Sequence, residues 1–344
     1  METLKPINPE ILHYTSNNLK IYSKSCSIYI ETLQALTRIK LPKSIYDLFS
    51  FSRILRRLLR IDKCNVFLIK VNPIELIIIR RGIVYKYQII SGLIKTLELK
   101  NCRNILHVDL CRLPNGDLVF GEYGSNNDRK SVPIYLSKDS GLSWDIIYEF
   151  PENSIKHIHV IKYDKWLDTI WCCTGDNDGE NKIVIFDKFF SILEEIGDGS
   201  QYYRTCDLFF TKTNVVWLMD SPNVISHVVN YNRKTKKINI GQELAGPVWY
   251  TTKVEDNLYL AATSVEPGYS MKHKTAQLMA SKDLINWEIV KSYKKDCYPI
   301  DLFKYGVIAF PLGDLYLSSF FYFGEALIKL DGKIDKINLT NVFR

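Results

Sequence analysis

Six stretches of this sequence repeat one arrangement: an apolar run, a short polar turn and a second apolar run. The arrangement recurs every 40 to 52 residues, beginning near Cys64, Asn104, Lys156, Tyr202, Pro247 and Tyr298. Two more strand-like runs follow each pair, as in KIVIFDKF and SILEEIG after the third pair. Runs rich in β-branched and aromatic residues indicate strands, and a four-stranded unit at this period is typical of a β-propeller blade. The sequence therefore predicts an all-β fold, a six-bladed β-propeller over residues 64–344.

A hairpin in the second unit carries the most specific motif. The stretch YLSKDSGLSW places Ser137, Asp139, Gly141 and Trp144 in the spacing Ser-x-Asp-x-Gly-x-x-Trp. An Asp side chain accepts hydrogen bonds from nearby backbone amides and Gly adopts positive φ, so both residues favour a tight turn. A shorter copy without the glycine, SKDLINW at residues 281–287, occupies the same place in the fifth unit. Both hairpins are expected between the third and fourth strands of their units.

The two hairpins resemble the Asp box, or BNR repeat, of the sialidase-like β-propeller superfamily. The resemblance covers residues 64–340 and implies a structural hairpin on the face away from the active site. Sialidases bind their substrate's carboxylate with three arginines, for which Arg80, Arg129 and Arg204 are the nearest counterparts here. The Phe/Tyr-Arg-Ile-Pro motif of the first arginine has no full match, because IIIRRG lacks the proline. The resemblance therefore implies the architecture and a glycan-related branch more than sialidase activity itself.

Positive charge is concentrated near the N-terminus. Residues 1–63 contain 11 Lys and Arg against 5 Asp and Glu, which gives +6 of the whole chain's +7. The nearly neutral remainder argues against nucleic-acid binding, which needs a basic stripe. The sequence has no apolar run of about 18 residues and no apolar segment typical of a secretory signal. We therefore expect an intracellular, cytoplasmic protein whose eight cysteines are reduced.

Residues 1–63 are predicted to form a basic N-terminal extension with an amphipathic helix at about residues 43–61. The apolar stripe of this helix consists of Ile45, Leu48, Phe49, Leu55, Leu58 and Leu59, and outside it lie Arg53, Arg56, Arg57 and Arg60. One interpretation is peripheral contact with an anionic membrane surface. The other is a helix packed on the propeller, with solvated arginines. The stretch NLKIYSKSCSIYI is compatible with an additional strand.

Propeller geometry predicts where a ligand site forms. Loops that enter first strands and loops that follow second strands collect on one face, and ligand pockets usually lie where such loops converge. The candidates at strand entries are His107, His157, His159, Tyr202, Tyr203, Arg204, Trp249, Tyr250 and Tyr298. The candidates after second strands are Arg80, Arg81, Glu122, Tyr123, Asp176, Asp178, Asp220 and Glu266, with Arg129 and Tyr269 in longer insertions.

These residue types suit an anionic sugar. Aromatic rings stack on sugar rings, arginines bind a carboxylate or phosphate through two hydrogen bonds, and carboxylates with histidine supply acid–base pairs. The predicted catalytic residues are Glu122, Asp176 and His157. The predicted substrate-binding residues are Arg80, Arg81, Tyr123, His159, Tyr202, Arg204, Trp249, Tyr250 and Glu266. Arg204, His157, Glu122 and Asp176 are expected to meet at the mouth of the channel; the competing interpretation is a buried network in which Arg204 neutralises Asp176.

Two features bear on metal binding. His157 and His159 are two residues apart on a predicted strand and therefore point to the same side, but a metal site needs at least a third ligand. The stretch DNDGE, residues 176–180, has only a trace of a calcium loop. Hydrogen-bonding channel histidines are favoured over a metal site, so no metal and no cofactor are predicted.

Two functions are compatible with these observations. The first is a carbohydrate-active protein that binds or processes an anionic glycan or sugar nucleotide, for instance in surface-glycan assembly. As an enzyme it would be glycosidase-like or glycosyl-transferring. The second is a non-enzymatic propeller that serves as an assembly or protein-interaction module through the same face. A carboxylate pair about 5–9.5 Å apart favours glycosidic chemistry, whereas a flat apolar face favours the second function.

Overall fold

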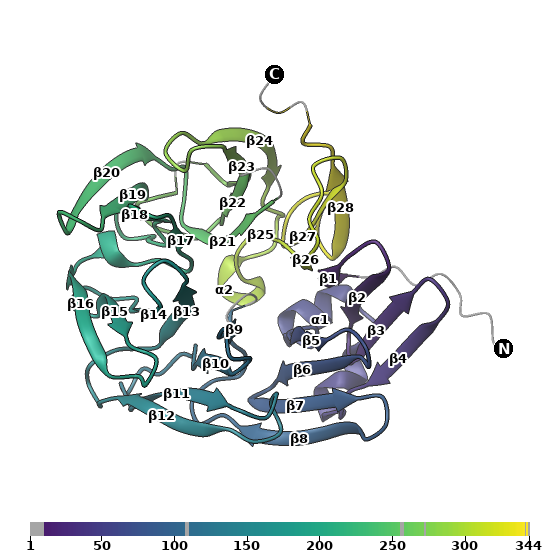
Figure 1. Ribbon diagram of the computed structural model, residues 1–344. Helices are drawn as coiled ribbons and strands as arrows, with labels where there is room; N and C mark the ends of the chain where they lie inside the picture. Colours follow the sequence, from purple (N-terminus) through teal and green to yellow (C-terminus); the bar gives the residue numbers. More distant parts are fainter. Residues whose placement is uncertain (1–9, 107–109, 255–257, 272, 341, 343–344) are drawn as a thin grey trace. The chain divides into compact units, whose positions relative to one another are not determined.

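The computed structural model describes residues 10–106, 110–254, 258–271, 273–340 and 342. Strands dominate and form seven sheets, whose members are labelled in Figure 1. The chain divides into two compact units. The terminal unit comprises the chain up to Lys63, Thr251–Glu266 and the chain from His273 onward, and the central unit comprises Cys64–Tyr250 and Pro267–Lys272. Among the described residues, no helix is long and apolar enough to cross a bilayer.

The central unit contains four sheets, each built from four strands that are neighbours in sequence. The first two sheets consist of β5 (Asn65–Lys70), β6 (Glu75–Arg80), β7 (Ile83–Gln88) and β8 (Gly92–Glu98), and of β9 (Cys111–Arg112), β10 (Leu118–Gly121), β11 (Val132–Ser137) and β12 (Asp145–Phe150). The next two consist of β13 (Ile158–Asp164), β14 (Thr169–Thr174), β15 (Asn181–Phe186) and β16 (Ile192–Gly199), and of β17 (Phe209–Phe210), β18 (Asn214–Leu218), β19 (His227–Asn232) and β20 (Lys237–Glu243). The short helix η2 (Gln201–Tyr203) joins β16 to β17.

The terminal unit contains strands from both ends of the chain. Its first sheet has the order β26-β1-β2-β3-β4 and consists of β1 (Ile11–Thr15), β2 (Leu19–Lys24), β3 (Ser27–Thr32), β4 (Leu36–Lys40) and β26 (Leu312–Gly313). Another sheet consists of β21 (Val248–Lys253), which begins in the central unit, with β22 (Tyr259–Thr263), β23 (Thr275–Ser281) and β24 (Glu288–Lys294). The last sheet consists of β25 (Val307–Ala309), β27 (Phe320–Glu325) and β28 (Lys333–Ile337), and α2 (Ile300–Phe303) precedes it.

The prediction of six blades is wrong, because the structure has seven sheets. Each of the six sequence repeats contributes a sheet, although in the sixth the first apolar run forms α2 and β26 joins the N-terminal sheet. The seventh sheet is formed by residues 11–40, which the sequence placed in an N-terminal extension, and β26 from the C-terminal part of the chain completes it. β1 runs parallel to β26, with Tyr14 opposite Leu312 and Thr15 opposite Gly313. A two-residue strand from the other end of the chain has no local sequence signal, so the repeat pattern did not reveal this sheet.

The predicted amphipathic helix over residues 43–61 is also wrong. The chain forms instead a 3-10 helix, η1 (Ile45–Phe49), and a separate short helix, α1 (Arg53–Leu58). Arg56 and Arg57 of α1 are buried. Within the terminal unit, the arginines of α1 pair with the carboxylates of Glu10, Asp62, Asp296 and Asp331. These ion pairs direct the charged side of α1 inward, which apolar periodicity alone does not predict.

The Ser-x-Asp hairpins are hydrogen-bonded turns at the predicted places. Between β11 and β12, Ser137 Oγ donates to Asp139 Oδ1 at 2.8 Å and accepts from the backbone N–H of Gly141 at 2.7 Å. Asp139 Oδ1 also accepts from two further backbone amides at 2.9 Å. The copy at residues 281–287, between β23 and β24, has the same Ser-to-Asp bond at 3.0 Å. The side chains of the motif thus stabilise the turn itself.

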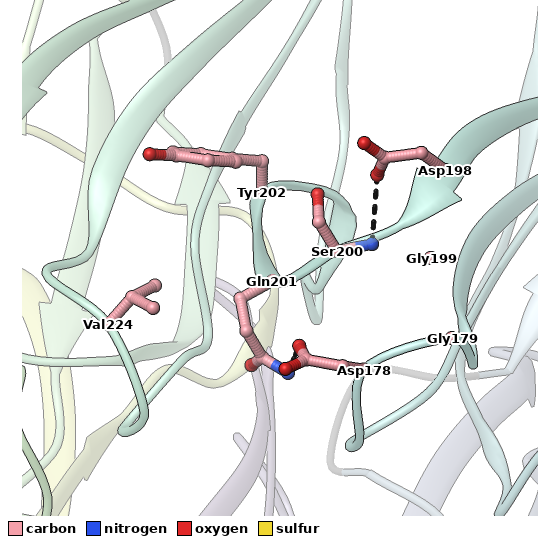
Figure 2. A pocket seen from close by; sticks show the side chains of 8 residues that line it. All are labelled: Asp178, Gly179, Asp198, Gly199, Ser200, Gln201, Tyr202 and Val224. Carbon is pink, nitrogen blue, oxygen red and sulfur yellow. Dashed lines mark hydrogen bonds between the residues drawn. The ribbon is translucent and has the colours of Figure 1, made fainter.

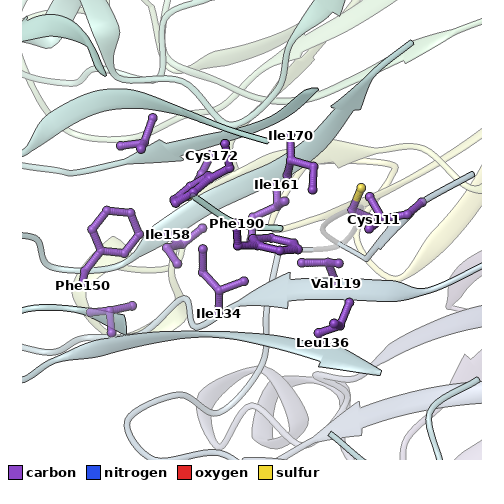
Figure 3. Close-up of a cluster of buried hydrophobic side chains, with 14 of the residues drawn as sticks. Cys111, Val119, Ile134, Leu136, Phe150, Ile158, Ile161, Ile170, Cys172 and Phe190 are labelled. Carbon is purple, nitrogen blue, oxygen red and sulfur yellow. The ribbon is translucent and has the colours of Figure 1, made fainter. Parts of the chain in front are cut away.

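Apolar side chains fill the space between neighbouring sheets of the central unit. Figure 3 shows the cluster between the sheets that contain β10 and β13, where Val119, Ile134, Ile158 and Cys172 are all fully buried. Ile158 is the first residue of β13 and points into this cluster. Successive side chains of a strand point to opposite faces, so the residues on either side of Ile158 face away from the apolar cluster. These residues are His157 and His159.

Candidate functional site

His157 and His159 form a close pair in the central unit. Their Nε2 atoms are 2.9 Å apart, and their rings lie 4.8 Å apart between centroids. On the other side of each ring, Nδ1 contacts a backbone carbonyl oxygen: that of Gly124 at 2.7 Å for His157, and that of Thr205 at 3.1 Å for His159. Both imidazoles are therefore fixed in orientation by the backbone, with their Nε2 atoms turned toward each other.

Asp176, which follows β14, brings a carboxylate to this pair. Its Oδ1 lies 3.2 Å from Nε2 of His159 and 3.4 Å from Nε2 of His157. Arg204 Nη2 donates to the same oxygen at 2.9 Å, and Arg204 Nη1 donates to the backbone carbonyl of Asp176 at 3.0 Å. Lys156 Nζ donates to Oδ2 at 2.5 Å. The carboxylate thus stands between two imidazoles and two cations.

A second carboxylate, that of Asp220, lies on the far side of Arg204. Its Oδ2 is 3.5 Å from Arg204 Nε and accepts a hydrogen bond from Cys206 Sγ at 3.2 Å. Asp220 is only 2% exposed. Tyr123 covers the histidines, with its ring centroid 4.3 Å from that of His157. All these residues belong to the central unit, and we call His157, His159, Asp176, Arg204, Asp220, Cys206, Lys156 and Tyr123 the histidine–aspartate cluster.

Burial sets most of the pKa shifts in the cluster. It lowers the pKa of His157 and raises the pKa of Asp220. It also raises the pKa values of the Cys206 thiol and the Tyr123 phenol well above their usual ranges. Burial acts to raise the pKa of Asp176 as well, but its interactions with the His157 and His159 imidazoles and the charge of the neighbouring guanidinium outweigh it and hold the pKa far below the usual range. At neutral pH, Asp176 is therefore ionised, whereas the thiol and the phenol keep their protons.

The structure places Glu122 differently from Asp176, although both follow second strands. The Glu122 carboxylate accepts hydrogen bonds from the backbone N–H groups of Lys100 at 2.7 Å and Asn101 at 2.9 Å, and from the Tyr135 hydroxyl at 2.8 Å. Only its backbone carbonyl approaches the histidines, accepting from the N–H of Ile158 at 2.9 Å. The Glu122 side chain therefore holds the loop between β8 and β9.

The remaining predicted residues lie in several places. Arg80 is buried at the end of β6, and Arg81 follows it with a positive φ of 54°. Trp249 and Tyr250 form an edge-to-face pair with centroids 6.4 Å apart. Tyr202 is on η2, and Glu266 belongs to the terminal unit. Elsewhere, Arg129 pairs with Glu180 at 2.6 Å, and His107 lies outside the described residues. Of the twelve residues predicted for the site, the structure brings together His157, His159, Asp176, Arg204 and Tyr123.

Sequence reasoning did not single out Lys156, Cys206 or Gln201. Lys156 directly precedes the histidine pair, and Cys206 is two residues after Arg204, so both positions were adjacent to recognised candidates. Gln201 donates through Nε2 to the backbone carbonyl of Asp176 at 3.1 Å and to Asp178 Oδ1 at 2.9 Å. Lys156, Cys206 and Gln201 meet the carboxylates of Asp176, Asp220 and Asp178 only in the folded chain, so no local sequence pattern identifies these contacts.

Gln201 also links the cluster to a hollow on the surface of the central unit. This hollow has a volume of about 350 Å³ and is lined by Asp178, Gly179, Asp198, Gly199, Ser200, Gln201, Tyr202 and Val224 (Figure 2). Asp198 Oδ1 accepts from the backbone N–H of Ser200 at 2.9 Å. The lining of the hollow thus combines two carboxylates, one amide and the aromatic ring of Tyr202, a residue that is 37% exposed.

Comparisons with known proteins show similarity in fold. Neither a protein-family model nor a curated protein sequence matches this chain. Among solved structures, virginiamycin B lyase from Staphylococcus aureus, determined with quinupristin, aligns with a TM-score of 0.59 and 13% identity over 98% of this chain and 97% of that chain. The GH74 xyloglucanase from Xanthomonas campestris aligns with a TM-score of 0.55 and 12% identity over 83% of this chain and 45% of that chain. These neighbours support a β-propeller, and at such identities they show the fold alone.

Proposed function

We propose that this β-propeller binds and processes a carbohydrate, in the form of an anionic glycan or sugar nucleotide, at the hollow beside the histidine–aspartate cluster. The observation that carries the proposal is that Tyr202, which is partly exposed, lines the same hollow as the carboxylates of Asp178 and Asp198. Such a ring stacks on the apolar face of a sugar, and carboxylates accept hydrogen bonds from its hydroxyl groups. Arg204 does not line the hollow but is linked to it, because Arg204 and Gln201 both donate to the backbone carbonyl of Asp176; it supplies the positive charge that an anionic group requires.

The chemical step in this proposal uses fewer residues than the sequence predicted. Glu122 accepts three hydrogen bonds that hold a loop, so we assign it no part in proton transfer. Asp176 remains ionised at neutral pH, and its low pKa makes it a weak base, so it is suited to orient a protonated partner and not to exchange protons itself. His157, which burial keeps neutral, is the partner next to it. We therefore propose His157 and Asp176 as the acid–base pair, in which His157 exchanges the proton and Asp176 orients His157.

The sialidase-like branch of β-propellers is part of the same proposal. Its support is the pair of hairpins in which Ser137 and Ser281 each donate to the aspartate two residues later. The fold neighbours include a xyloglucanase and an antibiotic lyase, and one fold can host many activities. The argument for a carbohydrate therefore depends on the residues around the hollow.

The test is a binding survey with acidic sugars and sugar nucleotides, followed by calorimetry. We expect at least one ligand to bind, and Tyr202→Ala to weaken its binding about fivefold or more, since truncation of an aromatic contact at the centre of a site costs more than about 1 kcal/mol. Phe189→Ala is the matched control, because this ring is 77% exposed and is not among the residues that line the hollow. Absence of binding across the panel, or equal affinity of the Tyr202→Ala variant, would contradict the proposal.

We also propose a second function, docking of the terminal unit on an anionic membrane, which is favoured by side chains of η1 and of the turn that follows it. Ile45, Leu48 and Phe51 are 72%, 72% and 80% exposed, although they are large and apolar. Lys43 and Arg60, which flank this segment, are exposed as well. Apolar side chains that enter the headgroup region next to basic residues are the usual means of peripheral attachment. The contact in this proposal is thus made by apolar residues, and not by the buried arginines.

Vesicle sedimentation tests this second proposal. Vesicles with anionic lipid should retain the protein at low salt and release it as salt rises, because exposed charges are screened over about 8–10 Å near physiological ionic strength. Leu48→Ser and Phe51→Ser should each reduce retention, whereas Phe189→Ser, a change at an equally exposed ring of the central unit, should not. If the wild-type protein stays in solution with anionic vesicles at low salt, the segment does not dock on membranes.

A further inference from the structure

The paired histidines present an electrostatic conflict. A backbone carbonyl oxygen only accepts hydrogen bonds, so the contacts of both Nδ1 atoms with the carbonyls of Gly124 and Thr205 require a proton on each Nδ1. In a neutral imidazole the other nitrogen then carries a lone pair. The Nε2 lone pairs of His157 and His159 therefore face each other at 2.9 Å, both almost fully buried. Two lone pairs at this distance repel unless a positive charge lies between them.

The Asp176 carboxylate adds a third lone-pair donor to the same point. Its Oδ1 is 3.2 and 3.4 Å from the two Nε2 atoms, so the three ligand atoms form a triangle with sides of 2.9 to 3.4 Å. Metal–nitrogen and metal–oxygen bonds of about 2.0–2.1 Å imply separations of about 2.9 Å between neighbouring ligands in an octahedral site and about 3.3 Å in a tetrahedral one. The triangle has the dimensions of one face of a metal coordination shell.

We propose that His157, His159 and Asp176 bind a divalent transition-metal ion of the Zn²⁺ class. Imidazole nitrogen with carboxylate oxygen suits zinc, iron or cobalt better than the oxygen-preferring Mg²⁺ and Ca²⁺. The carbonyls of Gly124 and Thr205 supply the second set of contacts that metal-binding histidines usually make through their other ring nitrogen.

Asp220 belongs to a second group of possible ligands, which shares His159 with the triangle. His159, Cys206 and Asp220 also have ligand atoms within 4.8 Å of one another. Asp220 is 2% exposed, and within the described part of the chain its Oδ1 has no hydrogen-bond partner. A buried carboxylate oxygen left in this state is stabilised by a cation. Asp176 is partly exposed, with 16% of its side chain accessible, so the ion has a route from solvent.

Arg204 and Lys156 fix the character of this site. Their two positive charges are balanced by Asp176 and by Asp220, whose Oδ2 lies 3.5 Å from Arg204 Nε. A bound dication therefore makes the cluster strongly positive, which favours an anion such as phosphate or carboxylate in an open coordination position. Binding of the metal follows from the triangle of ligand atoms and not from the carbohydrate proposal. With an ion bound, His157 and Asp176 would act as ligands, and a metal-bound water would take over the proton transfer proposed for that pair.

The experiment is equilibrium dialysis of the chelator-treated full chain against Zn²⁺, with the bound metal measured by mass spectrometry. We expect about one ion per chain. His157→Gln, His159→Gln and Asp176→Asn should each weaken binding at least about tenfold, the lower limit found when even the indirect contacts of a metal site are lost. His227→Gln is the matched control, since Nδ1 of His227 also contacts a backbone carbonyl, that of Gly241 at 3.1 Å, but the residue is not part of either ligand group.

Cobalt substitution supplies an independent readout. Co²⁺ bound by the triangle should give visible absorption bands that change in Asp176→Asn and persist in His227→Gln. Melting curves of each variant show whether it is folded, and any one folded ligand variant is enough for the comparison. The proposal is overturned if the wild-type chain binds no stoichiometric metal, if folded ligand variants bind as tightly as the wild type, or if NMR in the presence of Zn²⁺ shows one imidazole protonated on both nitrogens. No sugar is present in these measurements, so their failure is distinct from failure of the carbohydrate proposal.

Discussion

Arg56 offers a direct test of the inward-facing charges of α1. Its side chain is 7% exposed and lies between Glu10 and Asp62, whose side chains are 7% and 9% exposed. Its Nε donates to Asp62 Oδ2 at 3.0 Å, and its Nη2 donates to Glu10. Removing one partner of a buried ion pair costs about 3–5 kcal/mol, because the remaining charge has no compensation. Arg53 also contacts Glu10 at 3.2 Å and Asp62 at 2.9 Å, so we expect Arg56→Met to cost about 3 kcal/mol, at the lower end of that range.

Urea denaturation followed by circular dichroism measures this loss. Arg60→Met removes the same charge at an exposed position and should change the free energy of unfolding by less than about 0.5 kcal/mol. Burial raises the pKa of Asp62, and loss of Arg56 raises it further. The deficit of Arg56→Met should therefore be full at neutral pH and shrink as the pH falls and Asp62 becomes protonated. Equal stabilities of the Arg56→Met and Arg60→Met variants at neutral pH would refute the buried network.

Three further predictions concern the central unit. Trp144 is half-buried, so Trp144→Ala should lower stability by less than the roughly 3–5 kcal/mol of a fully buried tryptophan and leave ligand binding unchanged. Trp166→Ala, at a residue 45% exposed, should cost less still; calorimetric melting with binding measured in parallel decides. Burial acts to raise the pKa of Asp139, but hydrogen bonds from its turn lower it to about 2. The wild type should therefore be more stable than Asp139→Asn above about pH 4, and this advantage should disappear as the pH falls towards 2. Unfolding curves at several pH values measure it. A Cβ at Gly121 would lie 2.4 Å from Cδ1 of Ile158, so Gly121→Ala should lower the free energy of unfolding by about 1–3 kcal/mol. Adding Ile158→Val to the same chain should restore part of this loss in urea titrations; if it does not, β10 and β13 do not approach each other this closely.

The repeat predicted six of the seven sheets because each of these sheets is locally encoded. Five of them begin with a strand, a polar turn and a second strand that pair with each other, so the signal lies within about 20 residues of sequence. In the sixth, β25 pairs with β27, and β26 between them joins the N-terminal sheet. The N-terminal sheet contains four such strands over residues 11–40, but its first strand pairs with β26, from the opposite end of the chain. Pairing between chain ends has no periodic signal. The sequence therefore indicated the class of fold but gave one blade too few.

The segment at residues 43–61 shows a different limit of sequence reasoning. A helical stripe of apolar residues normally faces the core, and the arginines outside it would then face solvent. The partners that reverse this orientation are Glu10, Asp296 and Asp331, which lie far from the segment in sequence. In α1 the buried side chains are those of Arg56 and Arg57, whereas the apolar Ile54 and Leu58 are 44% and 39% exposed.

For the site, the sequence predicted correctly on which side of a strand the histidines lie, but not which hydrogen-bond and ion-pair partners the carboxylates meet. The spacing of His157 and His159 places both rings on one side of β13, where the structure has them. Glu122 and Asp176 occupy equivalent positions after second strands, yet one carboxylate holds a loop and the other contacts the histidines. The difference arises from which backbone amides and cations each carboxylate meets in the folded chain, and that information is not local.

Two buried polar clusters in this chain differ in a way that separates a structural role from a binding role. Around Arg56, guanidinium donors face carboxylate acceptors, so the network satisfies itself and contributes to stability. Around His157 and His159, lone pairs of two nitrogens and a carboxylate oxygen converge on one point, so the network requires a cation from outside. The two clusters should therefore respond oppositely to substitution. Arg56→Met should reduce stability and leave metal content unchanged. His159→Gln should lose the bound metal, while the metal-free protein keeps most of its free energy of unfolding. If both variants lose stability alone, the histidine cluster is a structural network like that of Arg56.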